Sequence, residues 1–204
     1  MRTSVAENLQ GSSLPGIGPI PAEFHGLFVS LAEAGEVSPE NLESFLSDPA
    51  SFKDRVVLRV DVNHTRSLAQ HLSYARLHEI HALVRNGHFP TDPAFGKETA
   101  EYRIIQTGFA ATTREVREEI EERGLTPANL YDTLAFAARY PGKQYQFEIA
   151  SLGGPCRKGT HDEYILVLGS RPSPDGRGKI RVLDILNTSC LVWHPDCRFL
   201  CRIA

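Results

Sequence analysis

The sequence predicts an α+β fold, in which an N-terminal helical hairpin precedes a mixed domain with a mainly antiparallel sheet. Three observations lead to this fold class. Near the N-terminus, Phe24, Leu27, Phe28 and Leu31 recur at three- and four-residue steps, which is the spacing of one helix face. The C-terminal third instead holds runs of β-branched and aromatic residues typical of strands. Between two of these runs, residues 173–178 have the Pro, Asp and Gly composition of a hairpin turn.

The chain divides into a leader, a hairpin and one larger domain. Residues 1–20 are rich in Gly, Ser and Pro and lack an apolar period, which is typical of a flexible leader. Residues 21–52 hold the two helices of the hairpin. The first ends at Gly35, and the second begins at Ser38-Pro-Glu, with a hydroxyl at the N-cap and proline at the first helical position. We expect residues 53–204 to form the α+β domain.

Helical and strand periodicities alternate within this larger domain. Gly124 ends one expected helix and Thr126-Pro127 begins the next. The expected helices cover residues 67–85, 113–123 and 126–140. The expected strands cover residues 55–62, 102–109, 145–152, 164–168, 179–186 and 197–203.

Composition excludes several classes of protein. The 204 residues include 22 Lys and Arg against 25 Asp and Glu, and 41% are hydrophobic, which excludes a chain that is disordered throughout. No run approaches the roughly 20 apolar residues that span a bilayer. The start of the chain, Met1–Asn8, lacks the apolar core of a secretory signal. We therefore expect a cytoplasmic protein with no membrane partner, and the oligomeric state stays open.

Histidines on the first expected helix of the larger domain are candidates for metal chemistry. His78 and His81 lie three residues apart, a spacing that lets two imidazoles on one helix face bind the same ion, with zinc as the candidate. With His88 and a strand carboxylate such as Asp61 or Asp184, they would form a metal-dependent hydrolase or nuclease. The favoured interpretation is an ordinary helix face, because the His-Glu-x-x-His spacing of zinc proteases is absent. We expect no cofactor, with zinc as the alternative.

Three of the four cysteines, Cys190, Cys197 and Cys201, lie near the C-terminus together with His194. These side chains have a composition compatible with zinc binding. However, Cys197 and Cys201 alternate with apolar residues in an expected strand, the pattern of an inward-facing strand. Free cysteine is among the most buried residue types. Core thiols are therefore favoured, with zinc ligands or a redox or nucleophilic cysteine as alternatives.

Two further segments carry groups that suit anions. Arg171, Arg177, Lys179 and Arg181 cluster around the hairpin turn and suggest a nucleic-acid surface. Because no stacking aromatics are interleaved with them, a solvated hairpin is favoured and nucleic acid is not the expected partner. The glycine-rich segment Leu152–Gly159 has amides that suit a phosphate. It lacks Walker spacing, so a loop between strands is expected there.

From about Val56 onward, the order of segments resembles a group of uncharacterised bacterial proteins whose C-terminal module ends Arg-Phe-Leu-Ala-Val-Arg. The matching stretches are Gly124-Leu-Thr-Pro-Ala-Asn-Leu-Tyr-Asp-Thr-Leu-Ala-Phe136, Tyr140-Pro141, Ser151-Leu-Gly-Gly154 and Arg198-Phe-Leu-Cys-Arg-Ile203. The arrangement is similar to C-type-lectin-like and formylglycine-generating-enzyme-like domains. This resemblance implies a scaffold that displays ligand-binding residues just before the final strand. The implied surface comprises Asn187, Thr188, Ser189, Leu191, Trp193, His194 and Asp196.

The chain departs from those domains in its functional residues. It lacks the Trp-Asn-Asp calcium triplet, a clear pair of lectin disulfides and the cysteine pair of the oxidase, so the resemblance implies a scaffold without a reaction. Our leading hypothesis is a non-enzymatic module that binds a protein or small-molecule ligand, with no catalytic residue assigned. Trp193 is expected to be the aromatic anchor of that surface, with a tryptophan that simply caps the core as the alternative. The alternatives are the metal-dependent hydrolase and a nucleic-acid-binding regulatory protein acting through the basic hairpin.

Overall fold

The computed structural model describes residues 56–90, 96–158, 162–188 and 191–203. The chain divides into two compact units, Met1–Leu58 and Arg59–Ala204. The predicted leader and helical hairpin, residues 1–20 and 21–52, lie outside the described residues. The elements below therefore belong almost entirely to the second unit.

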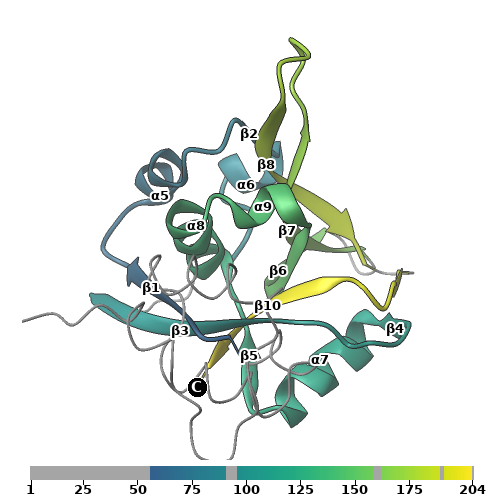
Figure 1. Ribbon diagram of the computed structural model, residues 1–204. Helices are drawn as coiled ribbons and strands as arrows, with labels where there is room; N and C mark the ends of the chain where they lie inside the picture. The colour runs from purple at the N-terminus through teal and green to yellow at the C-terminus, as the bar shows by residue number, and fades with distance from the viewer. Residues whose placement is uncertain (1–55, 91–95, 159–161, 189–190, 204) are drawn as a thin grey trace, which may run out of the picture. The chain divides into compact units, whose positions relative to one another are not determined.

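Strands and helices alternate along this unit (Figure 1). The strands are β1 (Leu58–Asn63), β2 (Glu79–Ile80), β3 (Lys97–Ile105), β4 (Ala111–Thr112), β5 (Leu125–Pro127), β6 (Ile149–Lys158), β7 (Asp162–Pro172), β8 (Lys179–Asn187), β9 (Val192–Trp193) and β10 (Arg198–Ile203). The helices are α5 (Leu68–Ala75), α6 (Ala82–Arg85), α7 (Thr113–Glu122), α8 (Leu130–Arg139) and α9 (Lys143–Gln146). The mixture confirms the predicted α+β class.

The strands form one eight-stranded sheet in the order β1-β3-β10-β6-β7-β8-β2, with β5 also paired to β10. Its pairs are antiparallel apart from β10–β6 and β2–β8, which are parallel. Cross-strand contacts between Arg59 and Glu101 and between Asp61 and Thr99 show that β1 and β3 also run antiparallel. A separate two-stranded ribbon joins β4 to β9, pairing Ala111 with Trp193. The mainly antiparallel sheet is thus confirmed.

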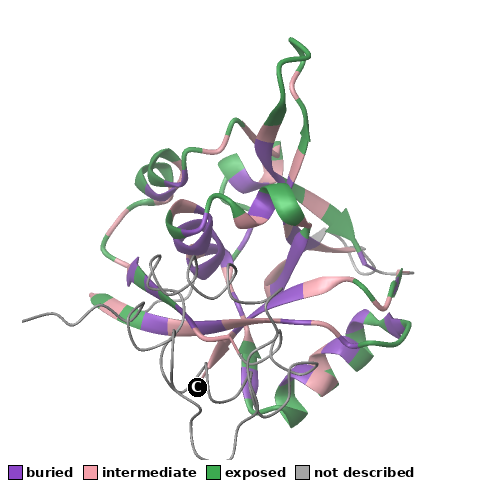
Figure 2. Cartoon of the chain, in the orientation of Figure 1, coloured by how far each residue is buried: buried purple, intermediate pink, exposed green. Residues whose placement is uncertain are grey.

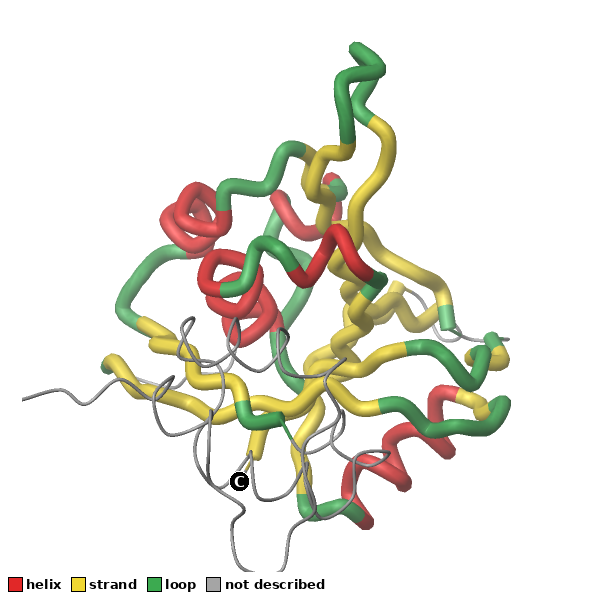
Figure 3. The backbone as a smooth tube through the Cα atoms, viewed as in Figure 1, coloured by secondary structure: helices red, strands yellow, loops and turns green. Residues whose placement is uncertain are grey.

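Side-chain caps explain where the longer helices begin. At α7, Thr112 accepts a hydrogen bond from the Glu115 N–H, and the Glu115 carboxylate accepts from the Thr112 N–H. Asn129 and Asp132 form the same reciprocal box at α8. Helix α8 packs on α5 and on β6 and β7, whereas α7 contacts β4 and β5 (Figure 3). The two groups of helices therefore cover different parts of the sheet.

The helix expected over residues 67–85 is divided into α5 (Leu68–Ala75) and the short α6 (Ala82–Arg85), and the residues between them are not helical. Helix α5 ends at Ala75, and Arg76 has a left-handed backbone with φ of 50° that turns the chain. The next residues form β2, in which Glu79 pairs with Val182 and Ile80 with Leu183. Residues 79–80 therefore hydrogen-bond to the backbone of β8, although their apolar period would also suit a continued helix.

The glycine-rich segment 152–159 was expected to be a loop, but its described residues lie in β6, next to a register shift between Ser151 and Cys156. The pairing of β6 with β7 is irregular between these two residues, and Gly154 has a φ of 62° there. Gly153 lies against the chain entering α8, because an added Cβ would stand 2.5 Å from the Pro127 carbonyl oxygen. Close backbone packing therefore explains these glycines without a phosphate.

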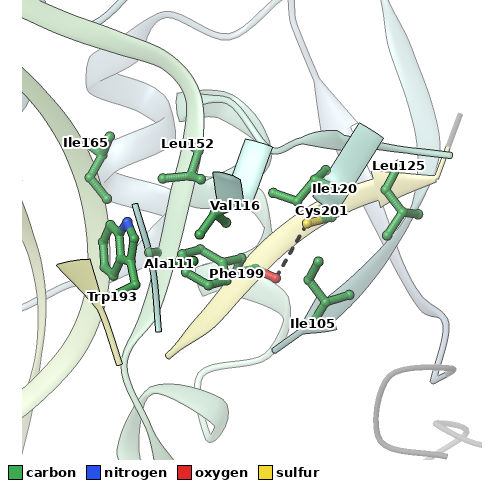
Figure 4. Packing of buried hydrophobic residues seen from close by; sticks show 11 residues of the cluster. Ile105, Ala111, Val116, Ile120, Leu125, Leu152, Ile165, Trp193, Phe199 and Cys201 are labelled. Atoms are coloured by element: carbon green, nitrogen blue, oxygen red, sulfur yellow. Dashed lines mark hydrogen bonds between the residues drawn. The ribbon is translucent and has the colours of Figure 1, made fainter. Parts of the chain in front are cut away.

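The core is concentrated in the central strands and α8, and the exposed residues lie on the β7–β8 hairpin and along α7 (Figure 2). Strand β10 is buried on both faces, since Phe199, Leu200 and Cys201 are each 0% exposed. Around it packs an apolar cluster comprising Ile105, Ala111, Val116, Ile120, Leu125, Ala150, Leu152, Ile165, Trp193, Phe199 and Cys201 (Figure 4). This cluster joins the ribbon and α7 to the sheet.

Candidate functional site

The two candidate metal-binding histidines do not share a helix. His78 and His81 flank β2, and each donates its backbone N–H to β8, at 3.0 Å to Arg181 O and 2.9 Å to Leu183 O. The Nδ1 atom of His78 accepts the Arg181 N–H at 3.3 Å, and that of His81 accepts the Leu83 N–H at 3.2 Å. These imidazoles fix the β2 connection, so the predicted helical pair is wrong.

The described residues contain no group of three or more His, Cys, Asp or Glu side chains placed to hold a metal ion. His71 is buried in α5, where its ring stacks on Tyr131 with centroids 4.5 Å apart. Since its Nε2 lies 2.9 Å from the Asn63 carbonyl, an acceptor only, Nε2 is the protonated nitrogen. Burial lowers the pKa of His71, so the neutral imidazole is favoured.

The cysteines near the C-terminus behave largely as core residues. Cys201 is buried in the apolar cluster, and Cys197 is partly buried against it. Burial raises the pKa of the Cys201 thiol to about 12, which disfavours a nucleophilic thiolate. The core-thiol interpretation is confirmed for Cys201, while Cys190 lies outside the described residues.

Trp193 does not form an exposed anchor, because its side chain belongs to the core. It is 5% exposed, and its Nε1–H donates to Thr113 Oγ1 at 3.1 Å. Its ring meets Phe199 edge to face, with centroids 5.2 Å apart (Figure 4). The sequence-based expectation failed because a lone tryptophan in a short strand carries no signal of which face is buried. Trp193 therefore supports the ribbon from beneath.

Of the other residues of the expected binding surface, Ser189 lies outside the described residues, Leu191 packs against the core cluster, and the remainder are either buried or exposed. Thr188 is buried, with its N–H donating to Glu163 O at 2.8 Å, so it is unsuited to contact a ligand. Asn187, at the end of β8, is exposed. His194 and Asp196 have side chains that are 72% and 80% exposed, with His194 Nδ1 3.4 Å from Asp196 Oδ2.

Two exposed apolar side chains that the sequence reasoning missed lie on and beside the ribbon. Val192 is 61% exposed and Phe109 is 46% exposed. Val192 alternates with Trp193 in β9, so the burial of one places the other outward. The loop containing Phe109 is tied to the loop after β9 by the Gln106 Nε2–H bond to Asp196 O at 3.1 Å. Alternation alone does not say which of the two faces solvent, so Val192 can be found only once Trp193 is known to be buried.

A second cluster missed from the sequence is an ionic network linking β3 and β10. Arg202 donates to both oxygens of Glu98, one of them at 2.9 Å, and His64 Nε2 lies 2.7 Å from Glu98 Oε1. The Tyr102 hydroxyl donates to Asp132 Oδ1 at 2.5 Å, and Arg202 stands 3.8 Å from the same oxygen. Hydrogen bonds from Arg202 and then His64 hold the pKa of Glu98 below its ordinary value.

The chemistry of this network favours a structural role. Burial, reinforced by Asp132, raises the pKa of Tyr102 far above its ordinary value, so its hydroxyl stays a donor. The His64 side chain is 3% exposed, and its Nδ1 finds no hydrogen-bond partner among the described residues. The remaining charged atoms are paired with one another. The network therefore holds β10 in register against β3. Few of its polar groups are left to contact a substrate.

The basic hairpin is less free than its sequence suggests. Arg181 is 5% exposed and donates to the carbonyls of Ala75, Arg76 and Ala137, where α5 and α8 end. Arg171 forms an ion pair with Glu79 of β2. Two of the four basic side chains thus have structural partners within the domain.

Comparisons with known proteins add no identification: no family model matches the chain, and neither a curated protein nor a solved structure matches it significantly. The resemblance to C-type-lectin-like domains stays a prediction. None of the helices in the described ranges combines the length and apolar composition needed to cross a membrane.

Proposed function

We propose that this protein is a non-enzymatic recognition module whose ligand-binding surface is the outer face of the β4–β9 ribbon and its adjoining loops. We name this the ribbon surface: Phe109, Val192, His194 and Asp196. The observation that carries the proposal is the exposure of Val192 and Phe109 on a segment whose other face is fixed in the core. The anchor expected from the sequence is thereby moved from Trp193 to its outward neighbour.

Rigidity beneath the ribbon supports a binding role. Trp193 is held by its hydrogen bond to Thr113, the first residue of α7, and by its contact with Phe199. A surface that is already ordered loses little conformational entropy when a ligand binds. Apolar side chains surrounded by polar ones such as His194 and Asp196 also have the composition of an interface centre and rim. The expected ligand is a protein segment or small molecule with an apolar group.

The test uses peptides selected from a displayed library on the immobilised full-length protein. Selected peptides should bind the Val192→Asp and Phe109→Ser variants at least about tenfold more weakly, which corresponds to losing a contact of about 1.4 kcal/mol. Tyr74→Ser is the matched control, because Tyr74 is 55% exposed on α5. Trp193, the only tryptophan in the chain, reports by its fluorescence that each variant keeps the ribbon folded.

Binding that is insensitive to both ribbon substitutions, or that falls equally in Tyr74→Ser, would contradict the proposal. A selection that yields no peptide specific for the wild-type protein would also count against it. The metal-dependent hydrolase stays a prediction, for which metal analysis of the purified protein is the direct test.

A further inference from the structure

Three segments far apart in the sequence meet at the end of the sheet that holds β2 and β8. Strand β2 pairs with β8, and the Arg171–Glu79 ion pair links the same two regions. Arg181 bonds to the carbonyls that end α5 and α8, and α9 packs on β7 and β8. Figure 1 shows α9, β2 and the β7–β8 hairpin together at this end. Residues 64–90, 133–147 and 169–183 therefore form one region, which we name the basic end.

The basic end is strongly positive although the whole chain has a formal net charge of −3. Its three segments contain nine Arg and Lys against two acidic residues, and with the exposed Glu148 and Asp184 that directly follow two of the segments the formal net charge is +5. The basic residues are Arg66, Arg76, Arg85, Arg139, Lys143, Arg171, Arg177, Lys179 and Arg181. Both acids within the segments are engaged locally, since Glu79 pairs with Arg171 and Asp175 accepts the Arg177 N–H at 3.0 Å. A region of this charge attracts a polyanion.

The same end carries exposed aromatic rings, which the hairpin sequence alone lacks. Tyr145 in α9 is 40% exposed, and Tyr74 in α5 is 55% exposed. The Arg66 guanidinium stands 4.3 Å from the centre of the Tyr74 ring. Basic groups with exposed aromatics are the combination that binds the phosphates and unstacked bases of single strands. The aromatic rings that the hairpin sequence lacks are therefore supplied by other segments of the basic end.

We propose that the basic end binds single-stranded nucleic acid, with its exposed Arg and Lys side chains contacting phosphates, Arg181 remaining an internal donor, and Tyr145 and Tyr74 stacking on bases. A bilayer surface fits less well. Apart from Pro174, the protruding turn between β7 and β8, Ser173–Gly178, holds no apolar side chain to insert among lipids. This site is separate from the ribbon surface and does not depend on it.

The test measures binding of fluorescein-labelled oligothymidylate and oligouridylate of about 20 nucleotides to the full-length protein by fluorescence anisotropy over a salt series. The logarithm of the affinity should fall with the logarithm of salt concentration, by about 0.7 per phosphate contact. Removing two contacts in Arg177→Gln/Lys179→Gln should lower that slope by about 1.4. Arg76→Gln/Arg85→Gln, at the C-terminal ends of α5 and α6, should do the same.

Two further variants test two separate points: whether stacking contributes to binding, and whether a positive charge elsewhere on the protein has the same effect. Tyr145→Ser should weaken binding about tenfold with an unchanged salt slope, because a stacking contact releases no counterions. Arg114→Gln is the charge-matched control for the single variant Arg177→Gln, since Arg114 is exposed on α7, away from the basic end (Figure 1). It should leave both affinity and slope unchanged.

Several outcomes would overturn the proposal. One is the absence of salt-dependent binding to either oligonucleotide, and another is an Arg114→Gln effect equal to that of Arg177→Gln. Tighter binding to a 20-base-pair duplex than to the single strands would contradict the assignment to single strands. Binding to vesicles containing phosphatidylserine without binding to oligonucleotides would assign the basic end to membranes instead.

Discussion

Replacing Arg181 with methionine tests the energetic importance of the guanidinium that joins β8 to two helix ends. Its Nη1 donates to Ala137 O at 3.0 Å, and its Nη2 donates to Ala75 O and, at 2.8 Å, to Arg76 O. Methionine keeps most of the apolar stem and removes all three donors. The carbonyls at the C-terminal ends of α5 and α8 would then lose partners that the helices themselves do not supply.

The expected cost follows from the burial of each carbonyl's residue. Ala75 and Ala137 are 0% exposed, so each carbonyl left without a partner costs about 1–3 kcal/mol. Arg76 is exposed, and its carbonyl regains a bond from water at little cost. Burial lowers the pKa of Arg181, which shows that desolvation of the guanidinium offsets part of the gain. The net destabilisation should be about 3 kcal/mol.

Urea unfolding followed by circular dichroism measures this change. With a slope of about 2 kcal/mol per molar urea, the midpoint should fall by about 1.5 M without a change in slope. Arg177→Met is the matched control because Arg177 is exposed in the hairpin turn, and its effect should stay within about 0.5 kcal/mol. An Arg181→Met variant as stable as the wild type would contradict this prediction. It would mean that the free-energy cost of burying the guanidinium equals the free energy gained from its three hydrogen bonds.

Three further predictions concern the sheet. Gly153→Ala should lower the free energy of unfolding by at least about 2 kcal/mol, since its Cβ would meet backbone atoms at 2.5–2.8 Å. Gly142→Ala is the control: no atom lies within 4 Å of its Cβ position, so the melting temperature should stay nearly unchanged. Because the pKa of Glu98 is lowered in the folded state, its carboxylate stabilises the fold above its unfolded pKa. That contribution is lost as pH falls through the folded value, so the destabilisation by Glu98→Gln should be full at neutral pH and shrink in acid; a pH-independent difference would contradict it. Cys201, with its pKa raised to about 12, should resist iodoacetamide in the native protein and react in urea, as mapped by mass spectrometry.

Local signals were sufficient for elements whose ends carry their own caps or turns. Helix α7 was expected over residues 113–123 and spans Thr113–Glu122, where its capping box defines its start. The hairpin turn lies at 173–178 as predicted, with the Ser173 N–H donating to Gly178 O at 2.8 Å. Strand β10 was expected over residues 197–203 and spans Arg198–Ile203. For α7 and the turn, neighbouring residues supply the hydrogen bonds that fix the boundary, whereas β10 was found from its apolar residues and pairs with the distant strands β3, β5 and β6.

The failures occur where a distant strand determines the local structure. Ile80 continues the apolar period of α5, but it pairs with Leu183, more than 100 positions away. Strand β5 was missed for the same reason, since Leu125 gains its strand structure by pairing with Ile203 of β10. Local sequence shows the period of the side chains, but it does not show that a distant strand has an edge free for pairing. These segments were therefore assigned to the helices beside them.

The binding candidates divide in the same way. The α+β class, the inward-facing Cys201 and the concentration of basic residues in the hairpin could be read from the amino-acid order, because composition and period act over a few residues. Strand pairing was needed to establish that Trp193 faces the core while Val192 faces solvent, and that Arg181 is an internal cap. It was also needed to establish that Arg76 and Tyr145 lie at the same end as the hairpin. Burial and summed charge depend on which segments the sheet brings together, and strand pairing over long sequence separations sets that arrangement.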